Sequence, residues 1–288
     1  MPSKNKDNFA VIILSHGRPD NVVTLKTLQN CGYTGQVILL VDNEDKALQA
    51  YQDNFSDILH VFDKRDYEGK FLVSDNFNHR RNVVFARNAC NDIANKNNLS
   101  NYLVLDDDYT SFSFRFDNEL KYKCEVVKDL DSLFECMVKF MQSTNVKTIC
   151  FAQGGDYLGG DQAGLADSIK LKRKAMNTFF LKNEHPIEWI GRLNEDVNTY
   201  VLHGRLGDLF FTTNQITINQ IPTQANAGGV TEEYLRNGTY VKSFYTVILS
   251  PSSVSISEII GQKNRRIHHR INWNQTVPKI IPETHKKK

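Results

Sequence analysis

Hydrophobic and polar positions alternate in blocks through the first half of the chain. Short apolar runs rich in β-branched residues are followed by amphipathic runs whose apolar positions repeat with the period of a helix. The predicted strands are Phe9–Leu14, Gln36–Val41, Ile58–Phe62 and Asn101–Leu105, and the predicted helices are Asn21–Leu28, Lys46–Phe55 and Val83–Lys96. This order of elements predicts an α/β fold in which helices cover a mostly parallel sheet.

The second half of the chain has a less regular pattern. Its clearest segments are the predicted helices Leu130–Met141 and Glu195–Leu202 and the predicted strands Thr148–Ala152 and Ala175–Leu181. A glycine-rich stretch runs from Gly154 to Gly160, and Gly and Asn turns separate the remaining short strands. Because no internal repeat or low-complexity linker divides the chain, we expect one domain over residues 1–260 and an irregular extension over residues 261–288.

The composition is that of an ordinary folded protein. Hydrophobic residues make up 40% of the 288 positions and charged residues 24%. No apolar run approaches the ~20 residues that span a bilayer, so no membrane association is expected. The five cysteines are an odd number without CxxC spacing, which indicates a reduced, cytoplasmic protein without a structural zinc site.

The charge of the chain is concentrated near its C-terminal end. The formal net charge is only +2, but the segment from Lys263 to Lys288 holds eight Lys or Arg and three His against the single acid Glu283. Such a segment is typical of a protein with a polyanionic partner such as DNA. The alternative is a solvated basic end that contacts nothing.

Three consecutive acids follow the predicted strand Asn101–Leu105. Asp106 and Asp108 are two positions apart at the carboxyl end of this strand, where open α/β sheets bind their ligands. Carboxylate oxygens are the ligands that Mg²⁺ and Mn²⁺ prefer, usually together with substrate phosphates. The sequence therefore predicts a divalent metal site at Asp106 and Asp108, with an acidic turn that binds no metal as the alternative.

Three further groups carry candidate chemistry. Arg87, at the start of a predicted helix, has the planar fork that binds phosphate, and the alternative is an arginine that pairs with a neighbouring carboxylate. Glu195 and Asp196 stand before a helix, where acids also serve as N-terminal caps. His268 and His269 are candidates for a third metal ligand or a phosphate clamp, or for solvated residues without a role.

Several of these residues together resemble a known block. Ala86-Arg87-Asn88, then Ile93-Ala94, then the strand that ends in Asp106-Asp107-Asp108 is similar to the corresponding block of inverting GT-A glycosyltransferases, the broad family of cellulose and chitin synthases. The resemblance implies a GT-A-like (Rossmann-like) fold, a Mn²⁺ or Mg²⁺ ion and a UDP-sugar donor.

The resemblance also implies roles for particular residues. The nucleoside is expected at the loop of Ser15, His16 and Arg18 and at Asp42, whereas the diphosphate and metal are expected at Arg87 and the three acids. Asp196 is the first choice for the base that accepts the proton of the acceptor hydroxyl, and Glu195 is the second. The nucleotide-sugar half is expected over residues 9–110 and the acceptor half over residues 111–260.

A narrower resemblance concerns the acceptor. The phrases Gly17–Asn21, Asp42–Asp45 and Arg80–Val84 are similar to the TET-associated glycosyltransferases of bacteriophages. That family implies transfer to 5-hydroxymethylpyrimidines in DNA, which agrees with the basic C-terminal segment, and a location in the host cytoplasm.

Alternative functions stay open. One is a glycosyltransferase of the same fold that acts on a polysaccharide, a lipid or a protein. The others are a nucleotidyltransferase, whose usual glycine-rich signature after the first strand is missing, and a non-enzymatic DNA-binding protein. No oligomeric state is assigned from the sequence.

Overall fold

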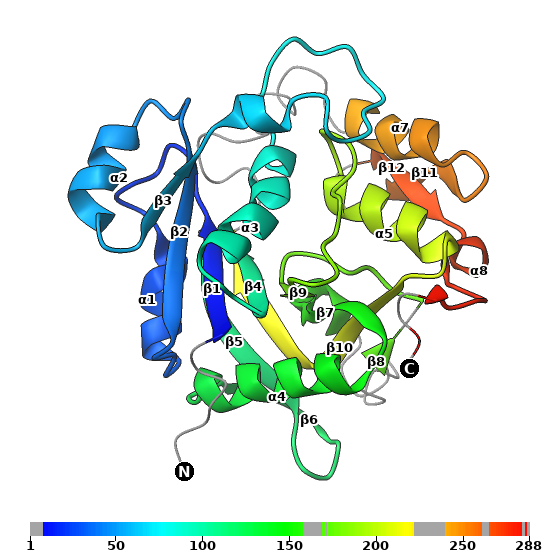
Figure 1. Ribbon diagram of the computed structural model, residues 1–288. Coiled ribbons are helices and arrows are strands. Elements are labelled where there is room, and N and C mark those ends of the chain that lie inside the picture. The colour runs from blue at the N-terminus through cyan, green and yellow to red at the C-terminus, as the bar shows by residue number, and fades with distance from the viewer. Residues whose placement is uncertain are drawn as a thin grey trace.

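The computed structural model describes residues 8–157, 169–170, 172–221, 240–260, 265–283 and 286 (Figure 1). The helices are α1 (Val23–Asn30), α2 (Leu48–Phe55), α3 (Val84–Lys96), α4 (Leu130–Ser143), α5 (Glu195–Arg205), α7 (Tyr240–Leu249) and α8 (Trp273–Thr276), with short 3₁₀ helices η2 (Lys64–Tyr67) and η3 (Gly154–Tyr157). The strands are β1 (Phe9–Leu14), β2 (Gln36–Asp42), β3 (Leu59–Phe62), β4 (Asn101–Asp106), β5 (Tyr109–Phe116), β6 (Tyr122–Val126), β7 (Val146–Gln153), β8 (Ile169–Lys170), β9 (Phe179–Lys182), β10 (Leu209–Gln220), β11 (Val254–Ile260) and β12 (Arg265–Ile271).

One ten-stranded sheet forms the centre of the described fold. Its order is β3-β2-β1-β4-β9-β7-β10-β5-β6, with β8 paired to β10. The pairings give seven of these strands one direction, while β5, β8 and β9 run the opposite way. The expected α/β fold with a mostly parallel sheet is therefore confirmed.

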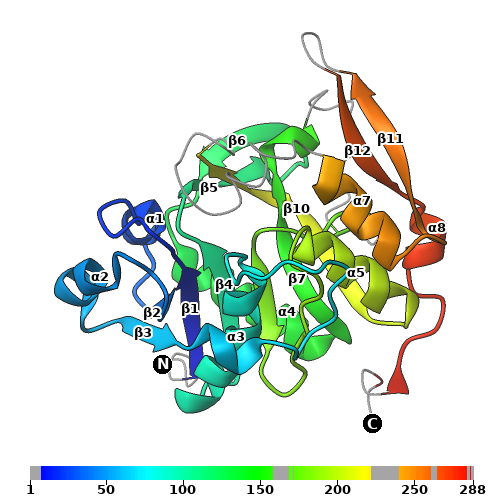
Figure 2. The same cartoon turned by 90° about the horizontal axis from the view of Figure 1, so that it is seen from above.

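The central strands β1, β2 and β4 are buried on both faces of the sheet. Along β1, Ala10 and Ile12 pack in the core cluster that contains α3 and α5, whereas Val11 and Ile13 pack in the cluster that contains α1 and α4. Figure 2 shows the helices on the two sides of the sheet. This double burial explains why β1, β2 and β4 are continuous apolar runs rather than alternating ones.

The register of the parallel strands determines where the site forms. Leu14 at the end of β1 pairs with Leu40 on β2 and with Asp106 on β4. The loops that follow these three strands consequently leave the sheet at the same edge, as expected for ligand-binding loops of an open α/β sheet.

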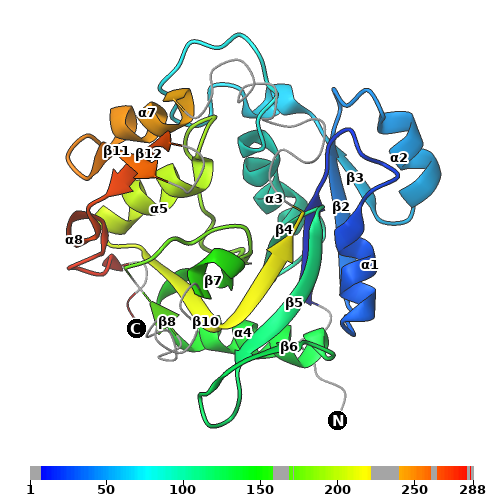
Figure 3. The same cartoon turned by 180° about the vertical axis from the view of Figure 1, so that it is seen from behind.

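The C-terminal part of the chain packs against α5. Strands β11 and β12 form an antiparallel hairpin, and the Ser243 hydroxyl of α7 donates to the Ile267 carbonyl of β12. Helix α8 lies so close to α5 that a Cβ on Gly204 would come within 2.2 Å of the Thr276 carbonyl oxygen. Figure 3 shows the hairpin, α7 and α8 grouped around α5. Residues 240–260 and 265–276 are thus part of the support of α5.

No helix within the described ranges has the length and apolar character that a membrane crossing requires.

Candidate active site

A cavity of about 370 Å³ lies at the carboxyl edge of the parallel strands. It brings together ten residues that the sequence singled out: Ser15, His16, Arg18, Asp42, Arg87, Asp106, Asp107, Asp108, Glu195 and Asp196. A larger hollow of about 480 Å³ lies between β6 and α4, but none of these ten residues lines it. Because the ten residues meet in the first cavity, we take that cavity as the candidate active site.

Asp107 joins the loop after β1 to the end of β4. Its carboxylate accepts a hydrogen bond from the Ser15 hydroxyl at 2.6 Å and pairs with the Arg18 guanidinium at 2.9 Å. The Tyr51 hydroxyl lies 2.6 Å from the Ser15 hydroxyl and accepts from the Arg18 amide. Asp107 is 1% exposed, and burial raises its pKa to about 6 although Arg18 opposes this. Both Asp107 oxygens are therefore engaged by the protein itself.

The backbone of the three-acid turn is held by helix α1. The Thr24 hydroxyl donates to the Asp106 carbonyl at 2.7 Å, and the Thr24 amide donates to the Asp107 carbonyl at 3.1 Å. The same hydroxyl accepts from the Tyr109 amide. One buried threonine thus fixes the turn, so Asp106 and Asp108 are presented from a rigid frame.

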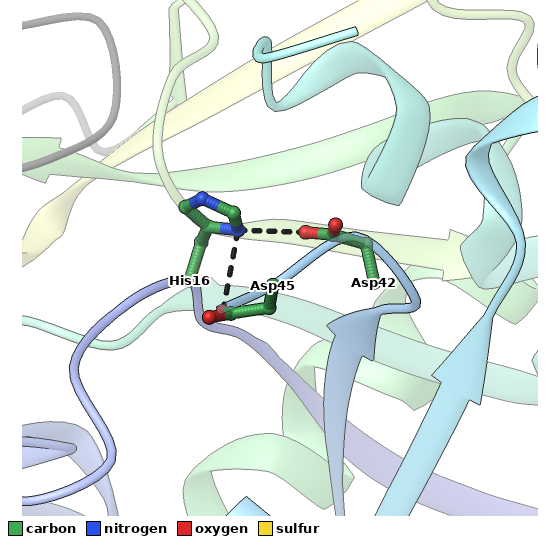
Figure 4. Close-up of side chains that lie close together, drawn as sticks. All are labelled: His16, Asp42 and Asp45. Atoms are coloured by element: carbon green, nitrogen blue, oxygen red, sulfur yellow. Dashed lines mark hydrogen bonds and ion pairs between the residues drawn. The ribbon is translucent and has the colours of Figure 1, made fainter. Parts of the chain in front are cut away.

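The turn after β2 forms a second charged group (Figure 4). His16 Nδ1 lies 2.7 Å from Asp42 and 3.3 Å from Asp45, and the ligand atoms of these three residues fall within 4.8 Å of one another. Asp42 also pairs with the buried Lys64 ammonium at 2.8 Å, and Asp45 accepts from the Gly17 amide. The three ligand atoms are close enough together to hold a metal ion. Lys64 and backbone amides such as that of Gly17, however, already bind the two carboxylates.

Lys64 and His16 stabilise the charged form of Asp42. Their hydrogen bonds and charges lower its pKa, although burial opposes the shift. Asp42 therefore keeps its negative charge at neutral pH and remains an acceptor at the cavity wall.

Arg87 occupies the centre of the site. Its guanidinium is 3.2 Å from Glu195 and 3.7 Å from Asp106, and its Cζ lies over the rings of Phe179 and Trp189, 4.8 and 5.1 Å from their centroids. Arg87 is 4% exposed. An unpaired buried charge would be strongly destabilising, so the two acids and the aromatic faces together make this position possible.

The acids around Arg87 outnumber the available positive charge. Burial raises the pKa of Asp106, and burial together with its two acidic neighbours raises the pKa of Asp108 to about 6. Burial and the Asp196 charge raise the pKa of Glu195 to about 7, although the Arg87 charge opposes this shift. Such perturbed carboxyl groups in one cavity are typical of a functional site.

Asn194 determines how Glu195 and Asp196 enter the cavity. It has a left-handed backbone (φ 55°, ψ 40°) and makes no capping hydrogen bond through its side chain. Its amide instead donates to the Lys242 carbonyl at 2.8 Å and to the Thr246 hydroxyl at 3.1 Å on α7. The strained residue is thus held by α7, and strain of this kind is concentrated at functional sites.

Neither His268 nor His269 is among the described residues that line the cavity. His269 is buried, and its Nδ1 lies 3.5 Å from the Asn194 amide nitrogen. Burial and nearby cations, among them Lys174 and Lys242, lower the pKa of His268 to about 4 and that of His269 to about 3. Both rings are consequently neutral at pH 7. Their role as metal ligands stays a prediction.

Further cavity residues were not predicted from the sequence. They are polar residues from scattered segments: Lys64, Arg81, Asn82, Gln153, Asn177, Arg192, Gln220 and Lys242. The left-handed backbone of Asn177 (φ 67°) leaves no pattern that sequence reasoning detects. Residues 159 and 160 of the glycine-rich stretch lie outside the described ranges.

The loop between η2 and α3 is tied to the rest of the site by one tyrosine. The Tyr245 hydroxyl donates to Asp75 at 2.5 Å and accepts from the backbone amides of Ser74 and Arg192. The Arg192 guanidinium in turn donates to the His79 carbonyl at 3.0 Å. Tyr245 on α7 thus connects the loop before α3 to the segment that leads into α5.

The mixed α/β sheet with strand-end carboxylates in one cavity is the arrangement expected for a GT-A-like glycosyltransferase. The chain belongs to the TET-associated glycosyltransferase family, because the model of that family matches residues 9–229, about three quarters of the chain. Membership in this family disfavours the nucleotidyltransferase and non-enzymatic alternatives.

Comparison with solved structures gives weak overall similarities. Glucosyl-3-phosphoglycerate synthase from Mycobacterium tuberculosis, in complex with Mn²⁺, UDP and phosphoglyceric acid, has a TM-score of 0.46 and 9% identity over 92% of this chain and 87% of that chain. A putative UDP-N-acetylglucosamine pyrophosphorylase from Entamoeba histolytica has a TM-score of 0.32 and 10% identity over 97% and 74%. No curated protein matches the chain significantly.

The raised pKa of Glu195 predicts a pH-dependent stability. An acid that holds its proton more tightly when folded stabilises the protein fully below its ordinary pKa of 4.5, and this stabilisation is lost as the pH rises to about 7. Glu195→Gln should remove this loss, so the free energy of unfolding should fall less between pH 5 and 7.5 than in the wild type, by on the order of 1–3 kcal/mol. Chemical denaturation at both pH values measures this difference.

The exposed Glu119→Gln variant is the matched control for removal of one carboxylate. If Glu195→Gln and the wild type lose stability in parallel over this range, the proton is not bound at Glu195.

Proposed function

We propose that this glycosyltransferase transfers a sugar from a UDP-sugar to the hydroxyl of 5-hydroxymethylpyrimidine in DNA, with inversion at the anomeric carbon. The observation that carries the proposal is the meeting of two carboxylate pairs, Asp106 with Asp108 and Glu195 with Asp196, in one cavity. The cavity volume of about 370 Å³ lies in the range of about 300–1,000 Å³ usual for ligand pockets.

Asp106 and Asp108 are the residues that fit a divalent metal. Asp107 is committed to Ser15 and Arg18, whereas the nearest paired cation to Asp106 is Arg87 at 3.7 Å. The raised pKa values of Asp106 and Asp108 indicate a shortage of positive charge at these carboxylates. A bound Mg²⁺ or Mn²⁺ would supply that charge and neutralise a diphosphate leaving group.

We assign the nucleoside to the part of the cavity at the ends of β1 and β2. Asp42 is an ionised acceptor held by His16 and Lys64, and it is suited to the donor groups of a ribose or base. Ser15 and Arg18 shape the same loop through Asp107. These partners support a positioned nucleoside site at the end of β1 and β2.

Asp196 is the proposed base. The acceptor oxygen bonds to the anomeric carbon as its proton passes to the Asp196 carboxylate, and the bond from that carbon to the diphosphate breaks with its electron pair leaving on UDP. Within the described part of the chain no ion pair includes Asp196, whereas the Glu195 carboxylate is 3.2 Å from the Arg87 guanidinium. Glu195 therefore serves better to hold Arg87, and Asp196 is the freer proton acceptor.

The acceptor assignment follows from the family and from the charge beside the cavity. Strand β12 exposes Arg265, Arg266 and Arg270, and α7 brings Lys242 to the cavity wall. Cations near the site can contact the phosphates of a duplex, and a base must leave the stack to reach a cavity. A neutral polysaccharide would make no use of these charges.

The metal assignment predicts that activity requires Mg²⁺ or Mn²⁺ and that Asp106→Ala or Asp108→Ala removes it while the thermal unfolding transition remains. The reason is that the diphosphate charge would have no counter-ion. UDP release is measured with and without excess chelator, and the exposed Asp57→Ala is the control. Full turnover of metal-free protein in chelator would contradict the assignment.

The base assignment predicts that Asp196→Asn binds the UDP-sugar normally but loses about 10²–10⁴-fold in turnover, because only the transition state needs the base. Glu195→Gln should lose less. Calorimetric donor binding and turnover are measured on each variant. Loss of donor binding in Asp196→Asn would show that the residue has a structural role instead.

The acceptor assignment predicts salt-dependent DNA binding through β12. Neutralising Arg265, Arg266 and Arg270 together should weaken DNA binding and flatten the plot of log K against log salt by about 0.9 per lost phosphate contact. Donor hydrolysis without acceptor should stay unchanged.

A matched control removes three exposed lysines elsewhere, Lys121, Lys123 and Lys139. Sugar transfer to hydroxymethylated and unmodified DNA is followed by nucleoside mass. An unchanged salt slope in the arginine variant, or transfer to a neutral polysaccharide instead of DNA, would refute the DNA acceptor.

A further inference from the structure

We propose that three amide side chains, Gln153, Asn177 and Gln220, bind the sugar of the donor and select an uncharged sugar. They are called the amide wall below. The inference rests on the proposed function and deepens it by naming the class of donor sugar and the residues that recognise it.

The amide wall stands beside the three-acid turn. Gln153 ends β7, Gln220 ends β10, Asn177 precedes β9, and all three line the cavity. Gln220 pairs across the sheet with Tyr109, the residue after Asp108, and the following Ile221 amide donates to the Asp108 carbonyl at 3.1 Å. The wall is therefore joined through backbone contacts to the turn assigned to the diphosphate.

Asn177 is held rigidly in this place. Its backbone is left-handed (φ 67°), a conformation that asparagine tolerates better than most residues, and its carbonyl accepts a hydrogen bond from the buried Tyr109 hydroxyl. The next residue, Thr178, accepts from the Phe151 amide at 2.7 Å. A strained residue that several partners hold in place suggests a role in ligand binding.

The amides keep hydrogen-bonding capacity for a ligand. Asn177 Nδ2 donates to Gln220 Oε1 at 2.7 Å, and an amide group has two donor hydrogens and an acceptor oxygen. The acceptor oxygen of Asn177 and the donor hydrogens of Gln220 consequently stay available to a ligand. If O and N were exchanged in both amides, the pair would still offer a donor and an acceptor. Sugar hydroxyls, which both donate and accept, complement such a pair.

The charges of the cavity favour an uncharged sugar. The wall itself is neutral, while the adjoining surface carries the carboxylates of Asp106, Asp108 and Asp196. Of the cations that line the cavity, Arg18, Arg87, Lys64 and Arg192 are already paired with acids. A sugar acid would therefore bring a further negative charge next to these carboxylates, which costs free energy.

The position of the wall favours the donor sugar over an extruded base. In a UDP-sugar the sugar is bonded directly to the phosphate assigned to Asp106 and Asp108, so it must lie next to that turn. Hydrogen bonds to its hydroxyls orient the anomeric carbon, and a site built on such bonds discriminates strongly against a sugar that lacks them.

The test uses Gln220→Met, which keeps the length of the side chain, and Asn177→Gly, which keeps the left-handed backbone. Asn219→Ala is the control, because its amide donates to Ser111 and is not among the described residues that line the cavity. Calorimetry measures UDP binding, and UDP release without acceptor measures donor hydrolysis.

With UDP alone, both wall variants should bind within about twofold of the wild type. With neutral UDP-hexoses, kcat/KM for hydrolysis should fall about tenfold in each, as expected for loss of about one hydrogen bond, whereas Asn219→Ala should keep its rate. The wild type should prefer a UDP-hexose to the corresponding UDP-hexuronate.

The outcomes separate this inference from the function on which it rests. Wild-type protein that binds no UDP would overturn both. Normal donor hydrolysis in Gln220→Met with a raised KM for the acceptor would refute only the role of the amide wall in donor binding, because the amides would then bind the acceptor. If Asn177→Gly fails to fold, Gln220→Met decides the question by itself.

Discussion

The buried guanidinium of Arg87 is the interaction on which the site depends. It connects the end of β4, through Asp106, to the start of α5, through Glu195, and it lies against the rings of Phe179 and Trp189. The charge of Arg87 thereby holds two separate elements, β4 and α5, together. Since a buried cation must be compensated, these two acids supply the negative charge that balances Arg87.

Much of the nucleotide half could be predicted from the sequence because its signals are local. The bounds of β1 match the expected strand, and the expected strand Asn101–Leu105 is β4, which extends by one residue to include Asp106. The strand expected from Ala175 begins only at Phe179, since Asn177 turns out of the extended conformation. Helix α7 contains many β-branched and aromatic residues but is helical, because its packing against β12 and α5 outweighs their preference for strands.

The candidate site was predictable only in part, because local signals mark the strand ends but tertiary packing determines the partners of each side chain. Residues at strand ends reach the cavity through the register of the sheet, so Asp42 and Asp106 could be placed in advance. The distribution of charge among them could not, because Lys64 and Tyr51 come from segments with no motif of their own. The sequence predicts which acids meet, whereas the tertiary structure determines which of them are already occupied by protein partners.

The contacts of α5 and its N-terminal residue with α7 and α8 have a consequence for biosynthesis. Strands β1, β2 and β4 are complete once about the first third of the chain has left the ribosome, and domains fold as their segments emerge. The support of Asn194 by Thr246 and the packing of Gly204 on Thr276 form only when nearly all of the chain is made. During translation, the strands of the nucleotide half therefore emerge before the residues that hold Glu195 and Asp196 in place, so the proposed base Asp196 is the last part of the site to be positioned.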